Sequence, residues 1–198
     1  NNISSPYIKM AQANDKYLQI ISNIKKGELK PVYLLMGDES YYIDSITDVI
    51  IENALDDSER DFNQTILYGL DAEISSLINT AKRYPMMSSR QLVVLKEAQM
   101  FDDIDDIILY VEHYQPSTVF VINYKGGVLK NKKLITAIEK IGAVYEFKKL
   151  YENQVPKFIT DYLQNYSLKI EPKAVAMLSD YIGNDLSRIA GELDKLRI

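Results

Sequence analysis

The sequence contains no cysteine, and its only histidine is His113. The lack of cysteine excludes disulfide scaffolds, thiolate metal sites and cysteine nucleophiles, and it is compatible with a reducing compartment. A single histidine also excludes clusters of imidazole ligands around a metal. His113 falls at the polar end of an expected helix, where a surface position favoured by the helix dipole explains it better than catalysis does.

Long apolar runs and an excess of positive charge are missing as well. No stretch approaches the roughly 20 apolar residues of a membrane span, and no signal peptide opens the chain. We therefore expect a cytoplasmic protein with no membrane partner. The 23 Lys and Arg residues are outnumbered by 28 Asp and Glu, giving a formal net charge of −5. This balance disfavours a broadly basic protein that coats nucleic acid.

What the chain does contain is the composition of a folded protein with a buried core. Of its 198 residues, 46% are hydrophobic and 26% are charged, which rules out disorder and fibrous folds. Continuous apolar runs at 32–36, 91–95 and 118–123 are typical of strands buried on both faces. Segments 62–67 and 143–147 read as two further strands. Segments with apolar residues at helical spacing lie between these five expected strands. This alternation predicts an α/β fold with a three-layer, mostly parallel five-stranded sheet.

Apolar residues recur at helical spacing between these strands, and after residue 149 only helical patterns remain. Residues 1–6 are expected to form a loose lead-in. The chain stops inside a helical pattern, so we expect a piece of a longer protein. We predict an α/β domain over 1–148 and a small helical domain over 149–198. The expected helices cover the following ranges: 14–26, a segment starting near 40, 74–81, 104–111, 134–138, 155–163, a segment starting at 172, and 186–196.

The turn after the first strand is where a P-loop protein would hold phosphate. That chemistry requires G-x-x-x-x-G-K-[ST], in which backbone N–H groups cradle the phosphates and the lysine neutralises charge. Here Gly37 is followed by Asp38 and Glu39, and both the second glycine and the lysine are absent. Repulsion between two carboxylates and a polyphosphate would cost on the order of several kcal/mol in binding free energy at an effective dielectric constant near 20. Acidic residues at a helix N-terminus explain the turn without any ligand.

The end of the third strand lacks the next nucleotide-site landmark. In a P-loop ATPase that strand ends in acidic residues, one linked to magnesium and one activating water. Lys96 stands where the metal-linked carboxylate should be, and a cation cannot replace it. Glu97 alone reads as an ordinary polar strand end. We therefore expect no bound cofactor and no catalytic residue.

Two charged clusters admit both a functional and a structural interpretation. Four aspartates suggest metal binding, but their place at the start of an amphipathic helix favours a solvated cluster that complements the helix dipole, and we expect no metal. Four lysines form a local basic patch that would suit a nucleic-acid backbone, or simply a solvated loop and helix start. The two clusters are Asp102, Asp103, Asp105 and Asp106, and Lys125, Lys130, Lys132 and Lys133.

A short segment before the third strand carries two adjacent methionines, Met86 and Met87. Pro85 prevents a helix from continuing, so the pair is expected in a loop. Two neighbouring loop residues cannot share one amphipathic face, which predicts that at least one side chain is exposed. Methionine is flexible and suits a hydrophobic pocket on another protein. The alternative is that both residues cap the edge of the sheet.

Taken together, three stretches resemble the delta subunit of the bacterial DNA polymerase III clamp loader. They are Pro31-Val32-Tyr33-Leu34-Leu35-Met36-Gly37-Asp38-Glu39-Ser40-Tyr41, the segment 84–95, and Gly183-Asn184-Asp185-Leu186 with Glu192-Leu193-Asp194-Lys195-Leu196. The resemblance implies an AAA+ fold with a degenerate nucleotide site, formed by Gly37, Asp38, Glu39, Lys96 and Glu97. It also implies that the second domain is a helical lid and that a collar domain is missing from this chain.

In that family, the loop before the central strand presents two neighbouring hydrophobic residues to a pocket on the ring-shaped sliding clamp. The resemblance places this role on Met86 and Met87, framed by Ser89, Arg90 and Gln91. Two methionines replace the commoner Leu-Phe pair, which keeps apolar area but loses an aromatic anchor. The implied function is to bind and open the clamp (the beta subunit) during DNA replication, without hydrolysing ATP.

The resemblance also implies partners and leaves alternatives open. The other clamp-loader subunits, gamma/tau and delta prime, are the expected partners, and DNA contact is expected to be indirect or weak, through the lysine patch. The chain would be a subunit of the polymerase holoenzyme without being an enzyme itself. An active P-loop ATPase or other nucleotide-binding enzyme on the same scaffold is one alternative, and a DNA-binding adaptor is another.

Overall fold

A five-stranded sheet, with all strands parallel, forms the centre of the larger part of the molecule. The structure is a computed structural model, and it describes residues 6–196. The strand order is β2-β3-β4-β1-β5, which confirms the predicted α/β sheet. The strands are β1 (Val32–Gly37), β2 (Gln64–Tyr68), β3 (Gln91–Lys96), β4 (Thr118–Lys125) and β5 (Ala143–Phe147).

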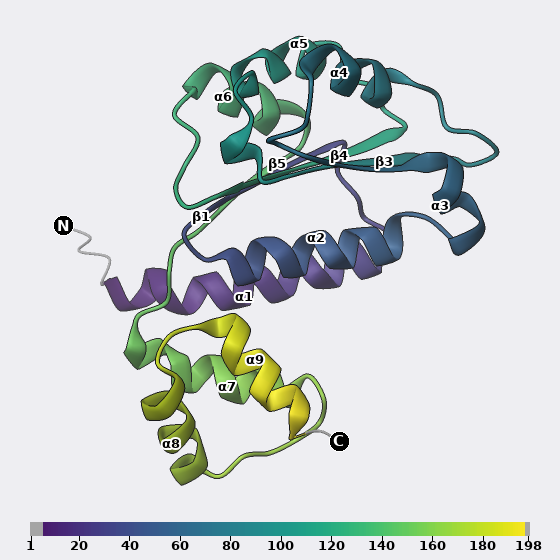
Figure 1. Cartoon of the computed structure of the whole chain (residues 1–198). Coiled ribbons are helices and arrows are strands. Elements are labelled where there is room, and N and C mark those ends of the chain that lie inside the picture. Colours follow the sequence, from purple (N-terminus) through teal and green to yellow (C-terminus); the bar gives the residue numbers. More distant parts are fainter. Residues whose placement is uncertain (1–5, 197–198) are drawn as a thin grey trace. The chain divides into compact units, whose positions relative to one another are not determined.

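Helices cover both faces of this sheet, so the unit has three layers (Figure 1). Helices α1 and α2 lie on one face, and α4, α5 and α6 lie on the other. Helix α3 lies beside the edge strand β2. Their bounds are α1 (Pro6–Lys25), α2 (Ser40–Ala54), α3 (Asp57–Asn63), α4 (Ile74–Lys82), α5 (Ile108–Val111) and α6 (Lys132–Ile141).

The apolar runs of the sequence form the middle of the sheet because only central strands are covered on both faces. All six residues of β1 are buried, as are the first five of β3 and the first six of β4. The edge strands β2 and β5 are partly exposed. Alternate residues serve the two faces: Leu34 and Phe120 join the core under α4, α5 and α6.

Three expectations for this unit need correction. Helix α1 begins at Pro6 rather than near residue 14, and proline is well suited to a first helical position. The expected lead-in otherwise lies outside the described residues. Phe62 and Asn63 belong to α3, so the strand predicted over 62–67 starts at Gln64. The helix predicted over 104–111 is a 3₁₀ turn (Ile104–Ile107) followed by the single turn of α5.

The chain divides into two compact units, Asn1–Lys148 and Lys149–Ile198. The second unit contains α7 (Val155–Gln164), α8 (Pro172–Ile182) and α9 (Leu186–Lys195). Each helix buries one apolar stripe in the core of this unit, including Phe158, Ile159 and Leu193. Asp185 caps α9 by accepting a hydrogen bond from the Arg188 N–H at 3.0 Å. Within residues 6–196, no helix has the length and apolar character needed to cross a membrane.

Candidate functional site: an exposed methionine loop and a filled turn

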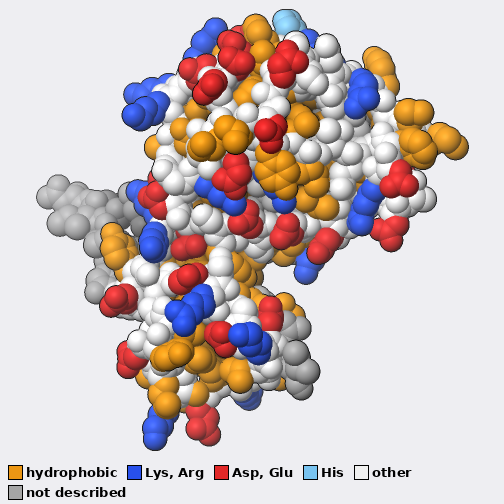
Figure 2. Space-filling view, viewed as in Figure 1, with side chains coloured by type: hydrophobic (Ala, Val, Ile, Leu, Met, Phe, Trp, Pro, Cys, Tyr) orange, Lys and Arg blue, Asp and Glu red, His pale blue; other side chains and the backbone are white. Residues whose placement is uncertain are grey.

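The loop between α4 and β3 carries the most exposed large apolar side chain of the described chain. Met87 is fully exposed, Met86 is 60% exposed, and Tyr84 is also exposed. Hydrophobic side chains gather at the projecting right-hand end of the α/β unit in Figure 2, where this loop lies in Figure 1. The two methionines therefore do not cap the sheet edge. They present apolar surface to solvent.

Helix α3 holds the backbone of this loop. The Asn63 side chain is buried, and its Oδ1 accepts a hydrogen bond from the Met86 N–H at 2.6 Å. Its Nδ2 donates to the Met86 carbonyl at 2.9 Å. Met87 adopts a left-handed backbone conformation with φ of 53°. For a residue with a side chain this conformation costs about 1–2 kcal/mol, so neighbouring contacts must fix it.

The three residues expected to frame the methionines differ in position. Ser89 is exposed and Arg90 is half-buried. Gln91 is buried, and its Nε2 lies 2.7 Å from the Arg83 carbonyl and 2.8 Å from the Thr118 hydroxyl. Its side chain thus ties the end of α4 to β3 and β4. Gln91 supports the loop from inside and has no surface to offer a partner.

The turn between β1 and α2 is short. Helix α2 begins at Ser40, so only Asp38 and Glu39 separate it from the strand. If Gly37 is the first glycine of a P-loop, its second glycine and lysine fall on Tyr42 and Ile43. Both of these side chains are buried inside the fold.

A carboxylate of the chain itself occupies the N-terminus of α2. The Glu39 side chain is buried and accepts a hydrogen bond from the Tyr41 N–H at 3.3 Å. This N–H is one of the free helix donors that a phosphate would otherwise use. Asp38, in contrast, is exposed. An anionic ligand at this helix end would meet the negative charge of Glu39.

An ion-pair cluster around Lys125 lies at the carboxyl ends of the neighbouring strands β3 and β4. The Lys125 Nζ lies 2.8 Å from Asp44 of α2 and 3.0 Å from Glu97, which follows β3. Hydrogen bonds from Gln99 and from Lys125 hold the pKa of Glu97 below its usual range. Burial alone would lower the pKa of Lys125, but its hydrogen bonds to Asp44 and Glu97 raise the pKa above its ordinary value.

The cluster separates Lys125 from the other three lysines of the expected basic patch. Lys130, Lys132 and Lys133 are exposed near the start of α6, whereas the Lys125 side chain is mostly buried in its ion pairs. The ion pairs thus distinguish Lys125 from the other three lysines. Prediction from sequence missed this because the partner Asp44 lies 81 residues from Lys125.

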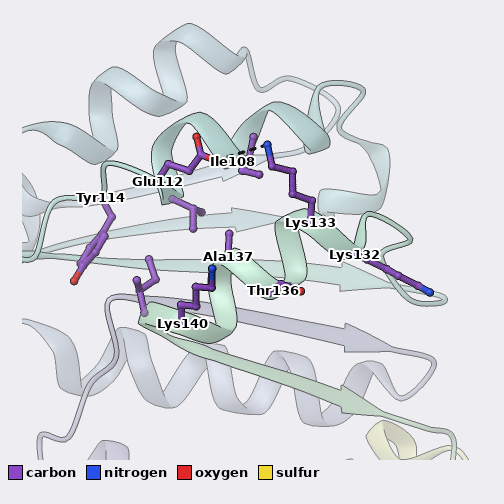
Figure 3. A pocket seen from close by; sticks show the side chains of 10 residues that line it. Ile108, Glu112, Tyr114, Lys132, Lys133, Thr136, Ala137 and Lys140 are labelled. Atoms are coloured by element: carbon purple, nitrogen blue, oxygen red, sulfur yellow. Dashed lines mark ion pairs between the residues drawn. The ribbon is translucent and has the colours of Figure 1, made fainter.

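A groove of about 500 Å³ lies between α5 and α6. Its lining includes Ile108 and Ala137, with lysines on the rim (Figure 3). Lys133 and Glu112 point toward each other, 3.8 Å apart, while Lys132 extends away. The Glu112 carboxylate thus neutralises part of the positive charge of the lysines on the rim. Within residues 6–196, no three His, Asp or Glu side chains gather in a way that would hold a metal ion.

Comparison with known proteins identifies the family of the chain. Residues 33–148, more than half of the chain, match the family model described as DNA polymerase III, delta subunit. The chain belongs to this family. It is 26% identical over 185 residues to DNA polymerase III subunit delta of Bacillus subtilis, covering 88% of this chain and 53% of that protein. This delta-family chain therefore spans about half the length of the curated relative it matches.

Solved structures place the fold in the same group. The DNA clamp loader delta protein of Bacillus subtilis superimposes with a TM-score of 0.76 at 26% identity, over 91% of this chain and 56% of that one. The Thermotoga maritima Holliday junction branch migration motor RuvB gives a TM-score of 0.51 at 16% identity, over 93% of this chain and 60% of that one. The second likeness concerns the fold alone. Together they confirm the predicted AAA+-like fold for this delta-family chain.

Proposed function

We propose that this chain captures and opens a ring-shaped sliding clamp, acting as the delta subunit of a bacterial clamp loader without hydrolysing ATP. The observation that supports this most directly is the pair Met86 and Met87, exposed at the tip of a loop whose backbone is fixed. The second support is membership of the DNA polymerase III delta-subunit family. Gamma/tau and delta prime subunits would be its partners, and the bacterial cytoplasm its location.

Two exposed methionines suffice for an energetic hot spot. Burying a methionine side chain contributes about 1.5–3 kcal/mol. Met87 has its whole side chain available and Met86 more than half. Since about 1.4 kcal/mol corresponds to a tenfold change in affinity, truncating either side chain should weaken capture about tenfold.

Opening the ring requires more than tight binding. A ligand shifts an equilibrium only by the difference between its affinities for the two states. The loop must therefore bind a clamp surface that fits better when the ring is open. A tip held rigidly on a scaffold suits this role, because a rigid anchor cannot relax to fit the closed ring equally well.

The β1–α2 turn supports a subunit that does not hydrolyse ATP. Glu39 lies at the helix N-terminus, and buried Tyr42 and Ile43 replace the P-loop glycine and lysine. Lys125 and Glu97 pair with each other, so Glu97 is not free to activate water. The alternative function is an active ATPase, and such an enzyme would bind labelled ATP with magnesium saturably at micromolar concentration. We expect no such binding.

The decisive experiment measures binding to immobilised clamp by surface plasmon resonance. We expect the double substitution Met86→Ala and Met87→Ala to weaken binding about 100-fold without changing the melting temperature. Met100→Ala is the matched control, since Met100 is also exposed on the α/β unit. If the double variant binds as tightly as the wild type, the proposal is wrong.

DNA contact through the exposed lysines Lys130, Lys132 and Lys133 is a second candidate. Replacing these three by alanine should reduce both DNA affinity and its salt dependence if they touch phosphate. Lys125→Ala is the matched comparison because this lysine is already paired. An effect of Lys125→Ala equal to that of the triple variant would argue against direct contact by the exposed lysines.

A further inference from the structure

Helix α3 contacts the methionine loop on both sides of Met87. On one side, the Asn63 amide makes the two hydrogen bonds to Met86 described above, one to its N–H and one to its carbonyl. Together they use both backbone groups of that residue. The same Nδ2 also lies 3.0 Å from the Glu59 carbonyl, one turn earlier in α3. Asn63 is 3% exposed, so its rotamer is fixed by packing as well as by these bonds.

On the other side, the Ser88 side chain interacts with the Glu59 carboxylate of α3 and helps to lower its pKa, while the Ser88 hydroxyl donates to the Arg90 carbonyl at 3.0 Å. The Asp56 backbone N–H donates to the same carboxylate at 3.0 Å, in the capping box that starts the helix. These bonds, the Asp56 one first, lower the pKa of Glu59 below its ordinary value, so it is an ionised acceptor at neutral pH. Met86 is therefore held directly by α3, and Ser88, on the other side of Met87, is bonded to Arg90 within the loop.

We infer that Asn63 is a positioning residue for clamp capture: through Met86 it holds Met87 in its left-handed, fully exposed conformation. This inference rests on the proposed function and extends it to a residue on a separate element. A free loop would have to be ordered on binding, and that ordering weakens affinity. Without Asn63, we expect Met87 to spend part of its time in ordinary right-handed or extended conformations that turn the thioether away from the clamp.

Two variants at this position separate the hydrogen bonds. Asn63→Ala removes both bonds to Met86, whereas Asn63→Asp keeps an acceptor for the Met86 N–H and loses the donor to its carbonyl. Asn53→Ala is the matched control, because Asn53 bonds only to the Val49 carbonyl on the exposed face of α2 in the contacts that the structure describes. Melting curves of all three establish that each variant folds.

The first readout is hydrogen exchange at the Met86 amide. We expect at least tenfold faster exchange in Asn63→Ala, a smaller increase in Asn63→Asp and no change in Asn53→Ala. The second readout is clamp affinity. We expect Asn63→Ala to weaken binding about five- to tenfold and Asn63→Asp to recover part of the loss. A loss of global stability would not produce this graded, local pattern.

A double-mutant cycle then tests the link to Met87. If Asn63 acts by positioning that side chain, Met87→Ala should cost less in the Asn63→Ala background than in the wild type. Strictly additive effects, or unchanged clamp affinity in Asn63→Ala while Met87→Ala weakens binding, would overturn the inference and leave the proposed function intact. If the wild-type chain does not bind the clamp, the proposed function fails and the positioning role fails with it.

Discussion

The ion pairs of Lys125 make a quantitative prediction about the stability of the fold. In Lys125→Met, the side chain keeps an unbranched stem one atom shorter but loses the charge that lies 2.8 Å from Asp44 and 3.0 Å from Glu97. Because both carboxylates are partly exposed, solvent screens each pair to about 0.5–1 kcal/mol. The two carboxylates would also repel each other without the cation between them. We expect a loss of about 1–2 kcal/mol in the free energy of unfolding.

Thermal melting at low ionic strength measures this loss directly. For a domain of this size it corresponds to a decrease of roughly 3–6 °C in the melting temperature. The difference should shrink as salt is added, since dissolved ions weaken ion pairs that are partly exposed to solvent. Lys130→Met is the control, because Lys130 is fully on the surface. Equal melting temperatures for Lys125→Met and the wild type at low salt would refute the reasoning.

Three further outcomes follow from contacts within the α/β unit. Gln91→Leu should cost about 1–2 kcal/mol in a denaturant titration, since it removes the amide donor to the Arg83 carbonyl and to the Thr118 hydroxyl. Gly37→Ala should prevent folding, seen as loss of a cooperative melting transition, because an added Cβ overlaps a β5 carbonyl and φ is 125°. Hydrogen bonds from Gln99 and Lys125 lower the pKa of Glu97 in the folded state. The stabilisation by Glu97 is therefore complete at pH values above its ordinary pKa of 4.5, and it is lost as the pH falls through the lower pKa of the folded state. A pH titration of the melting temperature should therefore show a smaller acid-induced decrease in Glu97→Gln than in the wild type.

The sheet was predictable because a strand covered on both faces must be apolar along its whole length. The runs at β1, β3 and β4 carry this signal without help from distant residues. Helix α3 was not predictable from periodicity, because its seven residues include only one large apolar side chain, Phe62, and that side chain is exposed. Its signal was the capping box of Asp56 and Glu59, three residues apart.

The exposed methionine pair was predictable from local chemistry, whereas the contacts that support it were not. Pro85 and the two adjacent methionines are neighbours in sequence, so a loop follows from backbone rules alone. Asn63 lies 23 residues away from Met86, and nothing in the sequence pattern connects them. The same holds for the pairing of Lys125 with Asp44, which lie 81 residues apart.

The most direct test of the central claim is an NMR titration of the methionine methyl groups with the sliding clamp. The chain has six methionines, which serve as probes at different positions. We predict that the Met86 and Met87 signals shift or broaden on binding, while exposed Met100 and Met177 and buried Met36 stay unchanged. Clamp binding that leaves the Met86 and Met87 signals in place would contradict the account.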